Sequence, residues 1–154
     1  MVPGLTRRLM NECENCSDMY EVFEHTADLG LRVKAASLNE LMADAASGLF
    51  SMIVVNLDDV EPVVTKTYKI AGNQLDYLLF DWLTELLYTF DTERLVLADF
   101  KVHLDESGLA GTCRGEPIDR EKHDLDHEVK AITYHQLKVN ETEAGWLAEL
   151  IVDI

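Results

Sequence analysis

The chain has 154 residues and carries 29 acidic against 13 basic side chains, a formal net charge of -16. This length suits one domain, and so negative a charge repels a phosphate backbone and disfavours strong direct nucleic-acid binding. It favours cations or a basic protein surface as partners. No uncharged apolar run is long enough for a membrane span or a secretory signal, so we expect a cytoplasmic protein with no membrane partner.

The first 18 residues show the periodicity of neither a helix nor a strand, and we expect an arm of residues 1–18 outside a domain of residues 19–154. Cys13 and Cys16 form a C-x-x-C pair in this arm, but no second pair completes a zinc site. Together with Cys113 they are too few for a disulfide framework, which favours a reducing compartment.

The first half of the domain predicts two strands, a helix and a third strand. Residues 20–24 are a short strand candidate, and residues 29–35 alternate apolar and polar side chains with the period of two that a strand requires. Ser37 and Glu40 have the spacing of a capping box, and the apolar residues that follow recur at helical spacing as far as Ile53. After an acidic loop, the β-branched segment 63–70 is typical of a strand.

The second half predicts one more helix and four strands. Asn73 is a plausible N-cap for a helix with a wide apolar stripe that ends at Phe90. The later strand patterns cover residues 96–104, 109–115, 129–139 and 146–152, with turns at 106–108 and 140–145. Because strands and helices do not alternate regularly, we expect a two-layer α+β fold: a mainly antiparallel sheet with two amphipathic helices packed on one face.

Acidic groups at two strand ends are the first candidates for chemistry. Asp28 follows His25 and two further residues at the joint between the first two strands, where an Asx-turn that satisfies local backbone amides is one explanation. The last strand is followed by Asp153 and Ile154, which places a side-chain carboxylate next to the terminal α-carboxylate. Converging carboxylates would bind a divalent ion such as Mg²⁺, Ca²⁺ or Mn²⁺, but the sequence alone does not establish that they converge.

A second group of polar residues runs from Glu116 through Lys122 and His123 to Lys130 and His135. So dense a set could serve proton transfer or phosphate contact, and its loop portion is equally consistent with a solvated surface segment. The odd separation of Lys130 and His135 places them on opposite faces of the predicted strand unless a bulge intervenes, so at most one should enter a site.

The sequence contains no nucleophile elbow, P-loop or dinucleotide fingerprint. Without a glycine-rich phosphate cradle or a Ser/His/Asp order, an autonomous enzyme is hard to build. The absence of these motifs favours a binding or accessory role over a catalytic one.

An ordered set of short motifs resembles the archease family over residues 19–154. The set comprises His25-Thr26-Ala27-Asp28-Leu29-Gly30, Asp81-Trp82-Leu83-Thr84-Glu85-Leu86-Leu87-Tyr88, Gly115-Glu116, Lys122-His123, Val129-Lys130-Ala131-Ile132-Thr133-Tyr134-His135 and Asp153-Ile154. The resemblance implies a non-catalytic accessory protein for the RtcB family of RNA ligases, which join tRNA halves in tRNA splicing with GTP and a divalent metal. Archease speeds guanylylation of the ligase and supports its multiple turnover.

The resemblance also implies site residues. Family members bind a divalent cation through the positions of Asp28, Asp153 and the Ile154 carboxylate, and the lysine matching Lys130 is linked to activation, although an ordinary surface charge also explains it. Glu116, His25 and His123 are further possible contacts with the partner. His25, His123 and His135 are expected to shape the local structure more than to ligate metal.

The sequence is compatible with more than one mechanism and more than one function. The metal-bearing end could deliver a metal to the ligase, or it could stabilise one ligase conformation through differential binding. A chaperone-like modulator of RNA- or DNA-modifying enzymes such as methyltransferases is the main alternative. A small metal-dependent hydrolase that uses Asp28, Asp153 and a histidine base is another.

Overall fold

The computed structural model describes residues 19–25 and 28–154 of the chain. The expected N-terminal arm, with Cys13 and Cys16, lies outside the described residues, and so do Thr26 and Ala27. The elements in chain order are β1 (Met19–His25), β2 (Asp28–Ala35), α1 (Leu38–Ile53), a 3-10 turn η2 (Leu57–Asp59), β3 (Val64–Ala71), α2 (Leu75–Glu93), β4 (Leu95–Asp105), β5 (Gly108–Pro117), β6 (Ala131–Thr142) and β7 (Gly145–Asp153).

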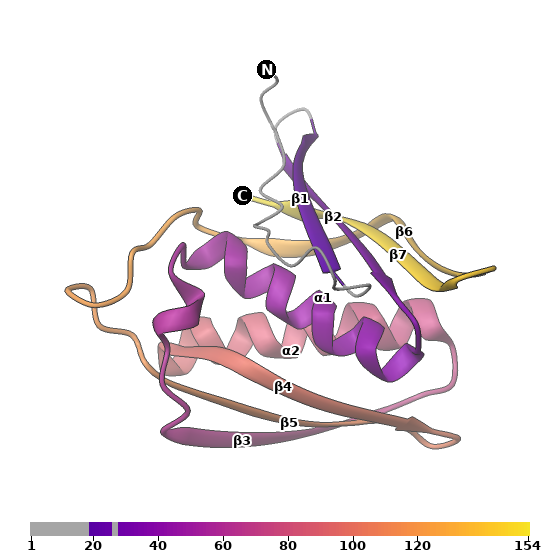
Figure 1. The fold of residues 1–154 in the computed structure, drawn as a ribbon, viewed down its shortest axis with the longest axis horizontal. Helices are drawn as coiled ribbons and strands as arrows, with labels where there is room; N and C mark the ends of the chain where they lie inside the picture. The colour runs from indigo at the N-terminus through magenta and orange to yellow at the C-terminus, as the bar shows by residue number, and fades with distance from the viewer. Residues whose placement is uncertain (1–18, 26–27) are drawn as a thin grey trace.

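The strands form two antiparallel sheets, and the two helices lie between them (Figure 1). One sheet has four strands in the order β1-β2-β7-β6, and the other has three in the order β3-β5-β4. The predicted α+β class, with antiparallel pairing and two helices, is confirmed. The strands divide into two sheets rather than the single sheet we expected, so apolar side chains of both sheets pack on one helix layer.

Helix α1 begins where its sequence predicts. The Ser37 side chain accepts a hydrogen bond from the Glu40 backbone N–H at 3.2 Å, which satisfies one of the free N–H groups of the first turn. Its apolar stripe, which includes Leu41 and Phe50, is fully buried. Phe50 stacks on Phe100 of β4 with ring centroids 5.9 Å apart, which fixes α1 against the three-stranded sheet.

Helix α2 lies alongside α1 and carries the largest fully buried side chain, Trp82. The Trp82 indole N–H donates to the Met42 carbonyl of α1 at 3.0 Å, so a buried polar atom on each helix is satisfied. The prediction of Asn73 as the N-cap was wrong: Gln74 occupies that position and makes no side-chain capping bond. The left-handed residue Arg94 (φ 53°) ends the helix.

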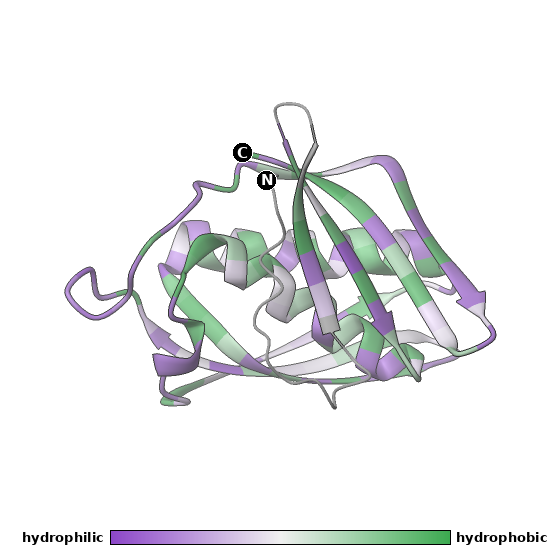
Figure 2. Cartoon of the chain, turned by 45° about the horizontal axis from the view of Figure 1, so that its top comes forward, coloured by the Kyte–Doolittle hydropathy of each residue, from purple (hydrophilic) through white to green (hydrophobic). Residues whose placement is uncertain are grey.

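Strand β7 lies between β2 and β6 and completes the four-stranded sheet. Hydrophobic and hydrophilic residues alternate along the strands of this sheet (Figure 2), as expected for a sheet with one buried face. The predicted turn at residues 140–145 was too long, since β6 continues to Thr142 and β7 begins at Gly145. Within the described part of the chain, no helix is long and apolar enough to cross a membrane.

Candidate functional site

The four-stranded sheet brings several of the predicted site residues to one of its ends. Strands β2 and β7 pair in antiparallel register with Leu29 opposite Val152, so the start of β2 lies beside the end of β7. Asp28 precedes Leu29 by one residue and Asp153 follows Val152 by one residue, so both lie just beyond this pair at the same end of the sheet. Asp28 also pairs with His25 of β1, so the ends of three strands meet here.

The start of β6 joins the same end of the sheet. Ala131 pairs with Asp153, and the Lys130 backbone N–H donates to the Asp153 carbonyl at 2.8 Å. Lys130 is exposed at this position. Residues from three segments far apart in sequence, namely positions 25 and 28, position 130 and position 153, therefore lie together.

Asp28 and Asp153 occupy the face of the sheet that points away from the helices. Leu29 and Val152 are buried in the core, and successive side chains of a strand point to opposite faces, so the two neighbouring aspartates take the outer face. Residues opposite each other on antiparallel strands share a face and lie within about 5.5 Å at Cβ. The two carboxylates are therefore placed to act on one ligand.

Arg32 on this outer face is already paired with two acids. Arg32 of β2 donates to Glu149 of β7 at 2.7 Å and to Glu21 of β1 at 3.3 Å. The Arg32 hydrogen bond lowers the pKa of Glu149 below its ordinary value. Within residues 19–25 and 28–154, no comparable side-chain ion pair neutralises Asp28 or Asp153.

The side chain of Ile154 is partly buried and packs on the hydrophobic core. This packing holds the end of the described chain in place beside Asp153, where ends are normally frayed. No three His, Cys, Asp or Glu side chains of the described residues form a group that could hold a metal ion. The predicted set contains only two such side chains, and its third donor is a main-chain carboxylate.

The donor set fits a hard divalent cation in its chemistry. Carboxylate oxygens are the ligands that Ca²⁺, Mg²⁺ and Mn²⁺ prefer, and a cation would offset the repulsion between carboxylates on neighbouring strands. Asp28, Asp153 and the Ile154 carboxylate are the residues that would hold it.

Glu116 and His123 form a separate cluster in the three-stranded sheet and the loop that leaves it. Glu116 is near the end of β5, and its carboxylate binds the Lys122 ammonium at 2.8 Å and the His123 Nε2 at 2.8 Å. The Lys122 hydrogen bond is the main cause that lowers the pKa of Glu116 from 4.5 to about 2, with smaller contributions from His123 and the Glu61 backbone N–H. The carboxylate is therefore ionised throughout the physiological range.

The tautomer of the His123 ring follows from its hydrogen bonds. Its side chain is fully buried, and its Nδ1 accepts a hydrogen bond from the Asp119 backbone N–H at 2.9 Å. Because Nδ1 is an acceptor, the proton of the neutral ring is on Nε2, which donates to Glu116. Both ring nitrogens are thus engaged, and the geometry supports a structural role for His123 as a brace of the loop.

The loop between β5 and β6 is fixed along its length, which places Lys130. The Asn56 side chain donates to the Lys122 carbonyl at 2.9 Å and accepts from the Asp124 N–H at 2.8 Å. Further along, the His127 N–H donates to the Met52 carbonyl at 2.9 Å. These bonds hold the loop against the end of α1. The loop therefore runs from the Glu116 cluster to the end of the four-stranded sheet where Asp28 and Asp153 lie.

Strand β6 contains the bulge that would be needed for Lys130 and His135 to share a face of the sheet. The register of β6 against β7 shifts between Thr133 and Lys138, and Gln136 has a positive φ of 65°. His135 is exposed in this bulged segment, while Lys130 lies beside Asp153.

Sequence reasoning missed an exposed aromatic group on α2 and β6. Tyr77 stacks on Tyr134 with ring centroids 5.3 Å apart, and Phe80 meets Tyr134 edge to face at 5.6 Å. The signal that could have found it is the position of Tyr77 and Tyr88 on the side of α2 opposite its apolar stripe.

Comparison with known proteins agrees with this architecture. The model of the Archease protein family matches residues 20–154. The chain is 41% identical over 140 residues to "Protein archease" of Pyrococcus furiosus, covering 88% of this chain and 98% of that protein. It is 39% identical over 139 residues to "Protein archease" of Methanopyrus kandleri, covering 88% and 99%.

A solved structure gives the same result in three dimensions. The solution structure of Methanobacterium thermoautotrophicum Protein 1598 superimposes with a TM-score of 0.78 at 34% sequence identity, covering 88% of this chain and 98% of that one. The fold and the strand-end geometry define a small α+β protein with acidic groups at one end of a sheet, and its sequence contains no P-loop motif. The chain belongs to the archease family.

Proposed function

We propose that this protein is a non-catalytic activator of an RtcB-type tRNA-splicing RNA ligase, and that it acts through a divalent cation bound by Asp28, Asp153 and the Ile154 carboxylate. Membership of the archease family supports the partner. The observation that carries the site is the antiparallel register of β2 and β7, which sets both aspartates on one face at one end of the sheet.

The residues at this end of the sheet have different roles in the proposed function. Asp28 and Asp153 supply hard oxygen ligands, and the Ile154 carboxylate is the third. The packing of the Ile154 side chain on the core supports this arrangement. When bound, the cation supplies positive charge next to the ligase's nucleotide pocket. Lys130, held beside Asp153 by its backbone hydrogen bond, extends an ammonium toward the docked ligase.

The test is multiple-turnover ligation by the RtcB-type ligase of the same organism, with GTP and metal, in the presence and absence of this protein. We expect stimulation by the wild type and its loss in Asp28→Asn and Asp153→Asn, which keep the side-chain size and remove the charge. Glu141→Gln is the matched control, because Glu141 is an exposed carboxylate that pairs with Trp146 at the other end of the sheet.

Two results would count against the proposal in different ways. If the wild type fails to stimulate a competent ligase, the partner is wrong and a chaperone-like role takes its place. If both aspartate variants stimulate as well as Glu141→Gln does, activation is real but the carboxylate site is not its source.

A further inference from the structure

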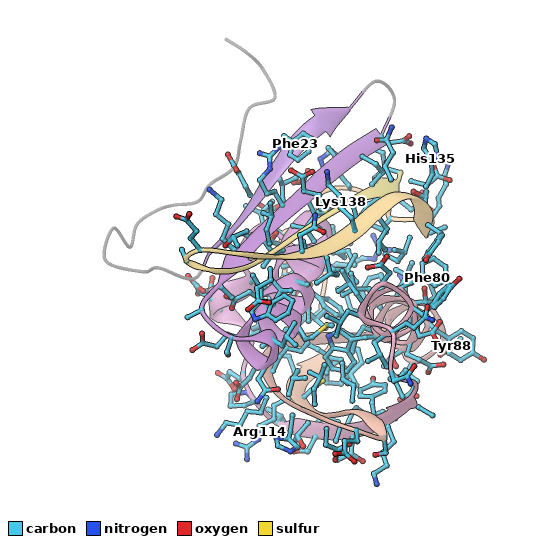
Figure 3. All side chains as sticks on the ribbon, turned by 90° about the vertical axis from the view of Figure 1, so that its right-hand side faces the viewer. Phe23, Phe80, Tyr88, Arg114, His135 and Lys138 are labelled. Carbon is cyan, nitrogen blue, oxygen red and sulfur yellow. The ribbon has the colours of Figure 1, made fainter. Side chains whose placement is uncertain are left out.

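Helix α2 presents a line of exposed aromatic and acidic side chains on its solvent side. Tyr77, Asp81, Thr84 and Tyr88 recur at intervals of three or four residues, so they share one face of the helix, and all are exposed. The stripe is about 16 Å long at 1.5 Å per residue. Figure 3 shows Tyr88 projecting from the helix at the edge of the molecule, with Phe80 on the same side.

The bulged segment of β6 adds a third tyrosine to this surface. Tyr134 lies parallel to Tyr77, with an interplanar angle of 8°, and rests its ring against Phe80. Tyr77, Tyr88 and Tyr134 are 53%, 63% and 42% exposed, so three large rings stand in water on one side of the protein. We call Tyr77, Phe80, Tyr88 and Tyr134 the α2–β6 aromatic surface.

The electrostatics of α2 point to the charge of the partner. The helix contains no lysine or arginine, and its acidic residues are Asp76, Asp81, Glu85, Asp91 and Glu93. Two of these lie in the last turn, where the helix dipole favours cations and disfavours carboxylates. Of these five acids, only Glu93 pairs with a basic side chain of the described residues, Lys66 at 3.0 Å.

These exposed rings and acids do not stabilise the folded monomer. Exposed aromatic rings, and an acid such as Asp91 at the helix C-terminus without a basic partner among the described residues, both raise the free energy of the folded monomer. Aromatic faces attract cations, and arginine combines a positive charge with a flat guanidinium that stacks on a ring while its N–H groups reach carboxylates. Tyr77, which stacks on Tyr134, follows Asp76 and lies one helical turn before Asp81, so both features occur together here.

We propose that the α2–β6 aromatic surface binds an arginine-bearing segment of a basic partner protein, with guanidinium groups stacked on the tyrosine rings and paired with the α2 carboxylates. This surface is on a helix and a bulge, whereas the metal site of the proposed function is at the strand ends, so the two can be tested separately. An extended segment of about five residues spans the stripe.

The probe is a fluorescein-labelled peptide of about nine residues made of Arg-Gly-Ser repeats, titrated with the whole protein and followed by fluorescence anisotropy; a Lys-Gly-Ser peptide of equal charge is the comparison. We expect the arginine peptide to bind at least about threefold more tightly than the lysine peptide. Tyr77→Ala and Tyr88→Ala should each weaken it about threefold, and Asp81→Asn with Glu85→Gln should weaken both peptides. Val63→Ala, at an exposed valine beside β3, should leave binding unchanged.

Two outcomes overturn the inference. One is equal binding of both peptides with no effect of the tyrosine variants, because attraction to the net charge alone then accounts for the signal. The other is a dimer by light scattering that Tyr77→Ala dissociates, because a second copy of the chain is then the occupant. Circular dichroism of each variant checks that the fold is kept.

Discussion

The ion pair of Glu116 gives a prediction whose size follows from the structure. Glu116→Gln keeps the side-chain length and an oxygen that can accept the His123 and Glu61 N–H groups, but it removes the charge that pairs with Lys122. A pKa lowered from 4.5 to about 2 corresponds to a ceiling of about 3.4 kcal/mol of stability. Because Lys122 is one-third exposed, solvent screening reduces this, and we expect about 1–2 kcal/mol.

The contribution of the Glu116 carboxylate to the free energy of unfolding depends on pH in a direction that its lowered pKa fixes. A carboxyl whose folded pKa is depressed contributes its stability above the unfolded pKa of about 4.5 and loses it as the pH falls toward 2. Equilibrium urea unfolding of wild type and Glu116→Gln, at pH 7 and at steps down to about pH 3.5, should show a gap that is constant above pH 5 and narrows below it. A gap that stays the same at every pH would mean that the pair does not depress this pKa, and the reasoning would be refuted.

Three further predictions concern the site and the core. A divalent cation such as Mn²⁺ at 100 times its dissociation constant should stabilise the wild type by about 2.7 kcal/mol and Asp28→Asn by much less, measured as a thermal shift; equal shifts would point to binding elsewhere. Gly30→Ala should lower the melting temperature, because a Cβ there would collide with the Phe23 ring, at a cost of about 1–3 kcal/mol; an unchanged melting temperature would show that the ring moves freely. Trp82→Phe should cost about 1–3 kcal/mol in urea unfolding, because it leaves the buried Met42 carbonyl without its indole donor, and a neutral result would show that water replaces it.

The sequence predicted those parts of the fold that depend on local pattern. The capping residue Ser37 and the apolar spacing located α1, and alternation located the strands. Which strands pair is decided by contacts between segments far apart, so the division into two sheets was not visible. The spacing of Lys130 and His135 required a bulge if they were to share a face. The sequence did not show that β6 slips by three residues against β7 at the segment where Tyr134 contacts Phe80 of α2.

The candidate site divides in the same way. Asp28 and Asp153 were found as acids at strand ends, and only the pairing of β2 with β7 brings them together. Glu116 and His123 were found as a polar cluster, yet their hydrogen bonds make them a brace of the loop rather than neighbours of those acids. The exposed tyrosines were overlooked because helical periodicity draws attention to the buried face.

The place of β7 in its sheet has a consequence for biosynthesis. Residues of β2 pair with residues of β7 that are more than 110 positions later in the chain; Arg32, for example, lies opposite Glu149. During translation β2 and β6 therefore emerge before β7, the strand that pairs with both of them. Contacts between residues so far apart in sequence form slowly. A ribosome that stops before β7 releases a chain in which Asp28 has no opposing carboxylate, so a truncated product lacks the paired acids at this end of the sheet.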